Sequence, residues 1–80
     1  MIEQEVLELE ILLRKLQGRL NAVNTALVNT NRKSDVSTLI HTQGKLHSNI
    51  KVAELEIDIA KKQMEIDNIL KQYEVEGSNG

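Results

Sequence analysis

Residues 29–35 read Asn-Thr-Asn-Arg-Lys-Ser-Asp, and this polar stretch separates two long heptad repeats of aliphatic residues. Asn, Ser and Asp favour turns because their side chains compete with the backbone for hydrogen bonds. We expect Ser34 or Asp35 to cap a following helix, and Asn31 to take the left-handed conformation that ends the preceding one. The stretch therefore predicts a turn between two helices.

The residues before this stretch form an uninterrupted coiled-coil seam. Aliphatic side chains recur at alternating steps of four and three residues, which places them along one side of a helix. We predict a helix over about residues 2–29. Its seam consists of Ile2, Val6, Leu9, Leu13, Leu16, Leu20, Val23 and Leu27.

A second seam begins after the polar stretch and keeps the same spacing, with Gln43 as its clearly polar member. It predicts a turn over about residues 30–35 and a second helix over about residues 35–75. Residues 1–76 would then be a single helical hairpin, and residues 77–80 a flexible tail. The second seam consists of Val36, Leu39, Gln43, Leu46, Ile50, Ala53, Ile57, Ala60 and Met64.

Folding the chain about residue 33 brings the two seams into register. The numbers of the two residues in every layer then add to 66, from Leu27 with Leu39 to Ile2 with Met64. Large residues face small ones where leucine or valine meets Ala53 or Ala60, as interdigitated packing requires. We predict an all-α fold, an antiparallel two-helix coiled coil. The alternative is one continuous coiled-coil helix of about 75 residues, roughly 110 Å long.

Further apolar residues lie outside both seams, mainly on the second helix. A helix that is apolar on two faces is normally buried on two faces. The second helix also extends past Ile2, so residues 65–75 have no partner within the hairpin. We expect the apolar residues outside the seams to bind a partner. The partner is either a second copy, which would complete a helical bundle, or another helical protein. The predicted partner-binding residues are Leu7, Ile11, Leu12, Val52, Leu55, Ile59, Ile66, Ile69, Leu70 and Tyr73.

Composition excludes several classes of protein. The 80 residues include no cysteine and no proline, and the net charge is −2. The longest apolar run has three residues, far short of the roughly 20 that a transmembrane helix needs. The acidic start lacks the basic and apolar segments of a secretory signal. We expect a cytoplasmic protein, or a component of a larger assembly such as a virion or a secretion apparatus.

Groups that carry out chemistry are sparse in this chain. His41 and His47 are six residues apart, so a helix points them in different directions and they do not chelate one ion together. The glycines form no phosphate-binding loop, and no nucleophile, base and orienting group occur at a recognisable spacing. We therefore expect no enzyme activity, no cofactor and no metal site.

Charge is distributed unevenly along the chain. Residues 31–51 carry a net charge of +3, whereas residues 52–80 carry −4. The basic middle offers a lesser alternative function, a nucleic-acid-associated dimer that uses Arg32, Lys33 and Lys45. The acidic total charge argues against it, because dedicated nucleic-acid-binding domains are normally basic.

In size, helix number and apolar face, the chain resembles two components of bacterial secretion systems. One is the needle or filament subunit of type III secretion, whose turn typically contains a proline that is absent here. The other is the very small helical cochaperone that masks such a subunit before assembly, and phage scaffolding and assembly factors share this outline. The resemblance implies a structural subunit or a small chaperone or adaptor. It involves no specific motif, so it assigns no functional residue.

Overall fold

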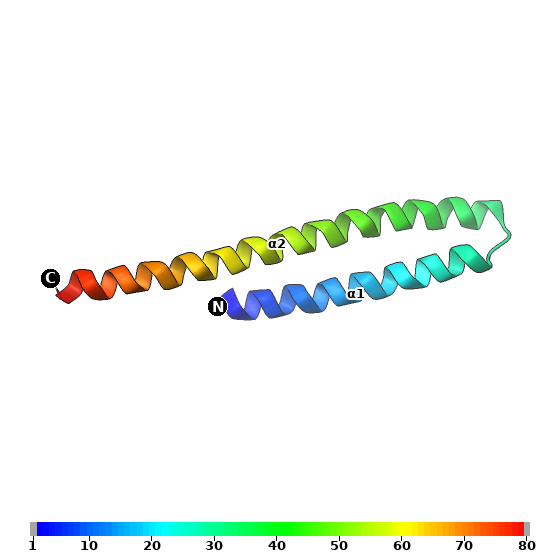
Figure 1. Ribbon diagram of the computed structural model, residues 1–80. Coiled ribbons are helices and arrows are strands. Elements are labelled where there is room, and N and C mark those ends of the chain that lie inside the picture. The colour runs from blue at the N-terminus through cyan, green and yellow to red at the C-terminus, as the bar shows by residue number, and fades with distance from the viewer. Residues whose placement is uncertain (1, 80) are drawn as a thin grey trace.

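The computed structural model describes the backbone of residues 2–79 and the side chains of residues 2–73. Over these residues the chain forms two α-helices and no strand: α1 spans Ile2–Asn29 and α2 spans Lys33–Asn79. The helices run antiparallel, side by side, and a short loop joins them at one end (Figure 1). The predicted helical hairpin is confirmed, and the alternative of one continuous helix is wrong.

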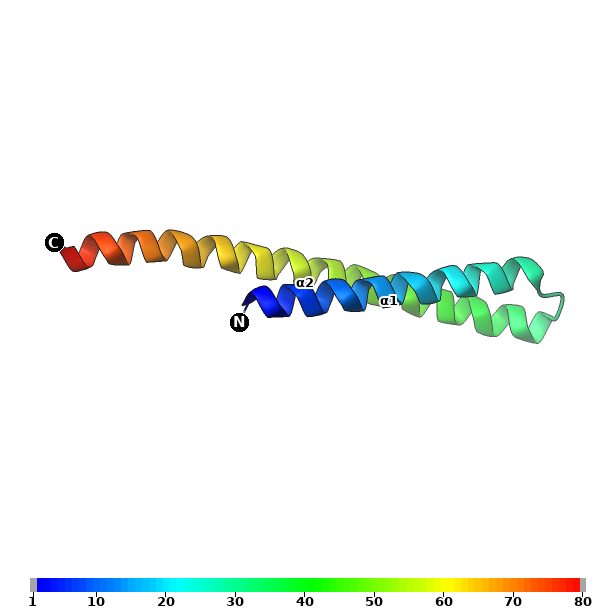
Figure 2. The ribbon, with the colours of Figure 1, turned by 90° about the horizontal axis from the view of Figure 1, so that it is seen from below.

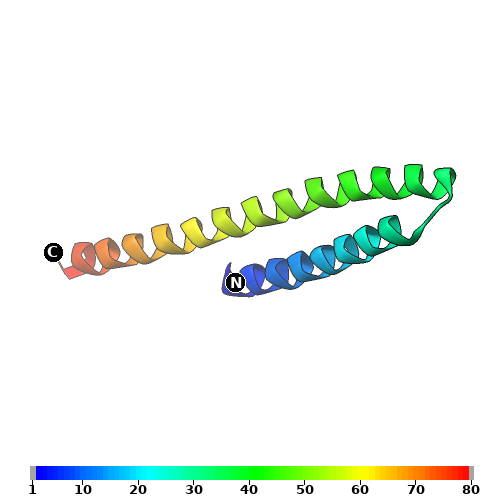
Figure 3. The same cartoon turned by 45° about the vertical axis from the view of Figure 1, so that its right-hand side comes forward.

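The hairpin is long and thin, and its two helices differ in length. Its principal extents are 72 × 15 × 14 Å. The helices cross at a shallow angle when viewed from below (Figure 2), as in a coiled coil. The C-terminal part of α2 continues well beyond the start of α1 (Figure 3). We call the loop end of the hairpin the tip, the end with the α1 N-terminus the base, and residues 65–79 of α2 the overhang.

The heptad seams are the contact between the two helices. Every residue of both predicted seams is buried or half-buried, whereas most of the other described side chains are exposed. The most buried side chains are Val6, Leu46, Ala53, Ile57 and Ala60. Four of these five lie toward the base, where the alanines of α2 face larger residues of α1 and let the helices approach. Buried side chains are therefore most frequent toward the base.

Contacts at the two ends of the hairpin support the predicted register. Ile2 and Met64, which share the last predicted layer, line the same surface groove. Near the tip, Gln43 donates a hydrogen bond from its Nε2 to Asn24 Oδ1 at 2.8 Å. Asn24 directly follows Val23, the residue that the register sets opposite Gln43. The contacts at both ends of the hairpin thus agree with one alignment.

The loop is shorter than the predicted turn, and its capping differs. Only residues 30–32 lie between the helices. Val36 donates its backbone N–H to Arg32 O at 2.9 Å, which makes Arg32 the N-cap. The prediction that Ser34 or Asp35 caps α2 is therefore wrong. The prediction that Asn31 is left-handed is also wrong, since no non-glycine residue of the described chain has a positive φ.

The register explains the shorter loop. Thr30 and Val36 form one further layer beyond Leu27 and Leu39; both are half-buried and line one groove at the tip. This layer holds the ends of the two helices together. Because Val36 has to lie in helical backbone to face Thr30, α2 begins ahead of it, at Lys33. Packing therefore outweighs the preference for a Ser or Asp cap, which is worth only about 1 kcal/mol.

At its other end α2 continues to Asn79, where the sequence predicts a helix end near residue 75 and a tail over residues 77–80. Met1 and Gly80 lie outside the described residues.

Candidate partner-binding surfaces

All ten residues that the sequence assigns to partner binding are exposed in the hairpin. Their exposed fractions run from 45% at Ile11 to 67% at Tyr73, which is high for apolar side chains. Contiguous apolar side chains in water mark a surface that binds another molecule. The ten are Leu7, Ile11, Leu12, Val52, Leu55, Ile59, Ile66, Ile69, Leu70 and Tyr73.

Six of these residues form a second heptad seam on α2. They lie three, four or seven residues apart, and Lys62 occupies the one position of the repeat that is not apolar. Val52, Leu55, Ile59 and Ile66 each lie two residues after a residue of the second seam. Ile69 and Tyr73 keep the same offset from residues 67 and 71, which continue that repeat, so the set projects from the side of α2 opposite its seam. We call this set the outer stripe. It consists of Val52, Leu55, Ile59, Ile66, Ile69 and Tyr73.

On α1, Leu7 and Ile11 lie one turn apart and also face away from the seam; we call them the α1 patch. Because α1 and α2 lie on opposite sides of their common seam, the α1 patch and the outer stripe face in opposite directions. The register sets Leu7 level with Ile59 and Ile11 level with Leu55. The base is therefore apolar on two opposed faces, and a single flat partner surface does not cover both.

The other two predicted residues, Leu12 and Leu70, lie along one side of the hairpin. Their heptad row also contains Glu5, Glu56 and Gln63, which border an open groove of about 440 Å³ between the helices. The floor of this groove includes Ile2, Leu9 and Ala60. This side is therefore a mixed polar and apolar edge that connects the two opposed faces.

Charged side chains flank the outer stripe. Lys51, Asp58 and Glu65 follow one edge at intervals of seven residues, and Glu56 lies on the other edge. Lys62, within the stripe, contacts Glu65 with an Nζ–Oε2 distance of 3.4 Å, and both side chains are largely exposed. An exposed pair of this kind contributes little to stability. The edges of the stripe are therefore predominantly acidic around a central lysine.

The surface area of the hairpin shows how much of it lacks cover. The chain exposes 6520 Å², whereas a compact monomer of 9.0 kDa exposes about 4,900 Å². The excess of about 1,600 Å² is roughly twice the 800 Å² that each partner buries in a standard protein interface. The thin shape of the hairpin therefore leaves more surface exposed than a compact fold of the same mass does.

Two exposed apolar residues at the tip are missing from the predicted set. Val28 is 85% exposed and Ile40 is 54% exposed. Each lies just outside a seam, directly after Leu27 or Leu39, and neither belongs to an apolar repeat. Periodicity therefore gives no signal for them. They are isolated side chains on a polar surface, which is common in proteins and marks no site by itself.

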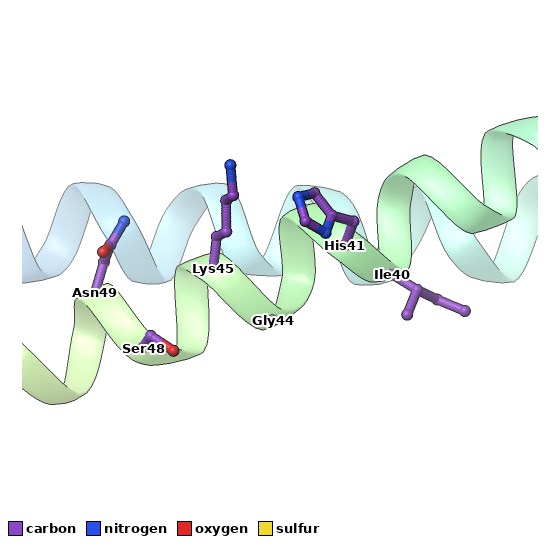
Figure 4. A pocket seen from close by; sticks show the side chains of 6 residues that line it. All are labelled: Ile40, His41, Gly44, Lys45, Ser48 and Asn49. Atoms are coloured by element: carbon purple, nitrogen blue, oxygen red, sulfur yellow. The ribbon is translucent and has the colours of Figure 1, made fainter.

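A shallow groove near the tip follows α2 around Gly44. It has a volume of about 620 Å³ and is lined by residues between Ile40 and Asn49. Lys45 and Asn49 project to one side of the helix in Figure 4, while Ile40 projects to the other. A Cβ atom added at Gly44 would meet nothing within 4 Å. The groove is therefore open helix surface beside a missing side chain.

The described residues contain no arrangement suited to catalysis or metal binding. No three His, Asp or Glu side chains among them gather around a common point. None of the described polar or charged side chains is buried. Neither helix, over the same residues, is apolar enough along its length to cross a bilayer. The exposed apolar surfaces are the distinctive feature of the molecule.

Comparison with known proteins gives no family assignment: no family model, no curated protein and no solved structure matches the chain.

Proposed function

We propose that this chain is a non-enzymatic protein–protein interaction or assembly component that binds helical protein through the apolar faces of its base. The observation that carries the proposal is the outer stripe. It has the heptad spacing of a coiled-coil seam and lies opposite the seam that packs against α1. A helix with two such seams packs between two other helices.

The modest core of the hairpin supports this proposal. Among the described residues, no large side chain is completely buried, and the five most buried side chains include two alanines. Small domains with so little burial commonly gain stability by association. A helix docked along the outer stripe would bury Ile59 and its neighbours. This would add apolar burial next to the most buried part of the existing core.

The proposal includes two forms that differ in what covers the base. In one, copies of the chain associate and build a structural assembly. In the other, the chain is a small chaperone or adaptor that holds the amphipathic helix of a secretion or phage assembly subunit. Both forms fit a location in the cytoplasm or within a larger assembly, and both use the outer stripe and the α1 patch.

The basic tip gives weaker support to a nucleic-acid-binding function. Arg32, Lys33 and Lys45 are exposed, but no aromatic side chain lies among residues 31–51 to stack on bases. The hydroxyls of Thr38 and Thr42 donate to backbone carbonyls of their own helix. The base, with its repeated apolar pattern, is the better supported surface.

Photo-crosslinking tests the proposed function at single positions. A benzoylphenylalanine at Ile59 lies on the outer stripe, whereas the same probe at Lys61 lies on a polar side of α2 at almost the same level. We expect the probe at residue 59 to form protein adducts, in purified protein or in cells that express the chain, and the probe at residue 61 to form far fewer. Equal yields at the two positions, or none at either, would refute the proposal.

A further inference from the structure

We propose that the outer stripe binds an amphipathic helix of a different protein, one with basic residues along its edges and a carboxylate that faces Lys62. This inference rests on the proposed function and specifies the chemistry of its partner. The charges around the stripe carry it, because they oppose pairing of two outer stripes in the alignments that overlap most, and they complement a helix of reversed charge.

The pattern of the stripe sets the size of the partner. Val52 and Tyr73 mark its ends, so it extends over about 32 Å of helix. An apolar repeat at heptad spacing is complementary to another helix with the same repeat. The partner segment is therefore a helix of about 22 residues or more, with apolar residues at steps of three and four.

Parallel pairing of two copies is opposed by Lys62. In a parallel, in-register pair, each seam residue lies opposite its own equivalent. The two Lys62 ammonium groups would then meet in the centre of the apolar contact. Each contacts Glu65 of its own helix, with an Nζ–Oε2 distance of 3.4 Å. Like charges brought together in a desolvated interface are strongly unfavourable.

Antiparallel pairing of two copies is opposed by the acidic edges. The alignment that sets Lys62 opposite Ile59 of the second copy places Asp58 beside Glu65 of the second copy, twice by symmetry. The alignment shifted by one heptad sets Lys62 opposite Ile66 of the second copy and places the two Glu65 side chains side by side. Both alignments that use most of the stripe therefore bring carboxylates together.

A further shift removes these repulsions but gives up most of the contact. It sets Lys62 opposite Tyr73 of the second copy and leaves only Ile66 and Ile69 as apolar layers. Such a short overlap buries little of the roughly 1,600 Å² that the hairpin exposes in excess of a compact monomer. The outer stripe of a second copy is therefore a poor match for the stripe as a whole.

A helix of reversed charge satisfies the same groups. Lysine or arginine along its edges would lie beside Asp58, Glu65 and Glu56, and one glutamate or aspartate in its seam would pair with Lys62. Pairing of this kind at the edges of a coiled coil determines which partner binds and in which alignment.

Two synthetic peptides of about 25 residues test the inference by fluorescence anisotropy with the full chain. Both carry the same Leu and Ile seam. The first has Lys at the edge positions and one central Glu in the seam; the second has Glu at the edges and one central Lys. We expect the first peptide to bind at least ten-fold more tightly. We expect Ile59→Asp with Ile66→Asp to abolish this binding, and Lys61→Asp to change it little.

The central contact is tested by a charge exchange. Lys62→Glu should weaken binding of the first peptide several-fold. Replacing the peptide's central Glu by Lys should then restore binding to this variant. Equal affinity for the two peptides, or no exchange at Lys62, would overturn the inference. So would a dimer of the full chain in sedimentation equilibrium that Ile59→Asp with Ile66→Asp dissociates, although the proposed function would then stand. No binding, no dimer and no crosslink at residue 59 would refute both.

Discussion

Gln43 Nε2 donates a hydrogen bond to Asn24 Oδ1 across the hairpin at 2.8 Å. Within the described residues it is the only side-chain hydrogen bond that joins α1 to α2, because the others connect residues of one helix or of the loop. Gln43 occupies the one clearly polar position of the second seam. A polar pair at such a position holds two helices in one alignment at some cost in stability.

The first prediction concerns this pair. Asn24→Ala leaves the half-buried Gln43 amide without its acceptor, so we expect a loss of about 1 kcal/mol in the free energy of unfolding. Gln43→Leu removes the polar group and adds apolar burial, so we expect a gain of about 1–2 kcal/mol. Urea unfolding followed by circular dichroism measures both. A matched Asn21→Ala change, on the exposed face of α1, should have a smaller effect than Asn24→Ala.

The same pair shows what the sequence is able to predict. Heptad spacing identifies every residue of the seam except Thr30 and aligns the helices, because burial repeats with the period of the backbone. The alignment follows from the position of the polar stretch between the seams. The heptad pattern does not predict the hydrogen bond itself, because Asn24 lies outside the seam.

The loop is where sequence preference and structure disagree. Ser34 and Asp35 have the side chains that favour the N-cap, yet Arg32 occupies it. Local preferences of about 1 kcal/mol yield to the layer that Thr30 and Val36 form across the tip. Likewise, periodicity identifies the outer stripe and the α1 patch separately. Only the arrangement of the two helices in space shows that they face in opposite directions.

A second prediction separates the seam from the outer stripe on one helix. Ile57 and Ile59 are two residues apart, but Ile57 is 6% exposed and Ile59 is 65% exposed. We expect Ile57→Ala to lower the free energy of unfolding by about 2–3 kcal/mol through lost burial and a cavity. Ile59→Ala should change it by less than about 0.5 kcal/mol in the isolated chain, as other exposed substitutions do.

Measurement at several protein concentrations extends this test. If copies of the purified chain associate through the outer stripe, Ile59→Ala will become destabilising as the protein concentration rises. Equal effects of the two substitutions at the lowest concentration would contradict the exposure of Ile59 in the hairpin.

A third prediction concerns the two glycines within the helices. Gly18 and Gly44 lie inside α1 and α2, and a Cβ atom at either would meet nothing within 4 Å. Glycine within a helix costs roughly 1 kcal/mol relative to alanine. We therefore expect Gly18→Ala and Gly44→Ala each to raise the free energy of unfolding by about 0.5–1 kcal/mol. A loss of stability for either variant would indicate that another helix approaches the backbone there.

The last prediction tests the hairpin itself in solution. The chain has no cysteine, so Glu8→Cys with Asp58→Cys allows two spin labels at defined positions. The register sets these exposed residues level with each other, and packed helix axes lie about 8–10 Å apart. Both side chains point away from the partner helix, so we expect a label distance of about 20–30 Å. One continuous helix would separate the same labels by about 75 Å. A ten-fold excess of unlabelled chain serves as the control. A short distance that survives this dilution arises within one chain, whereas one that disappears would show that α1 of one copy packs against α2 of another.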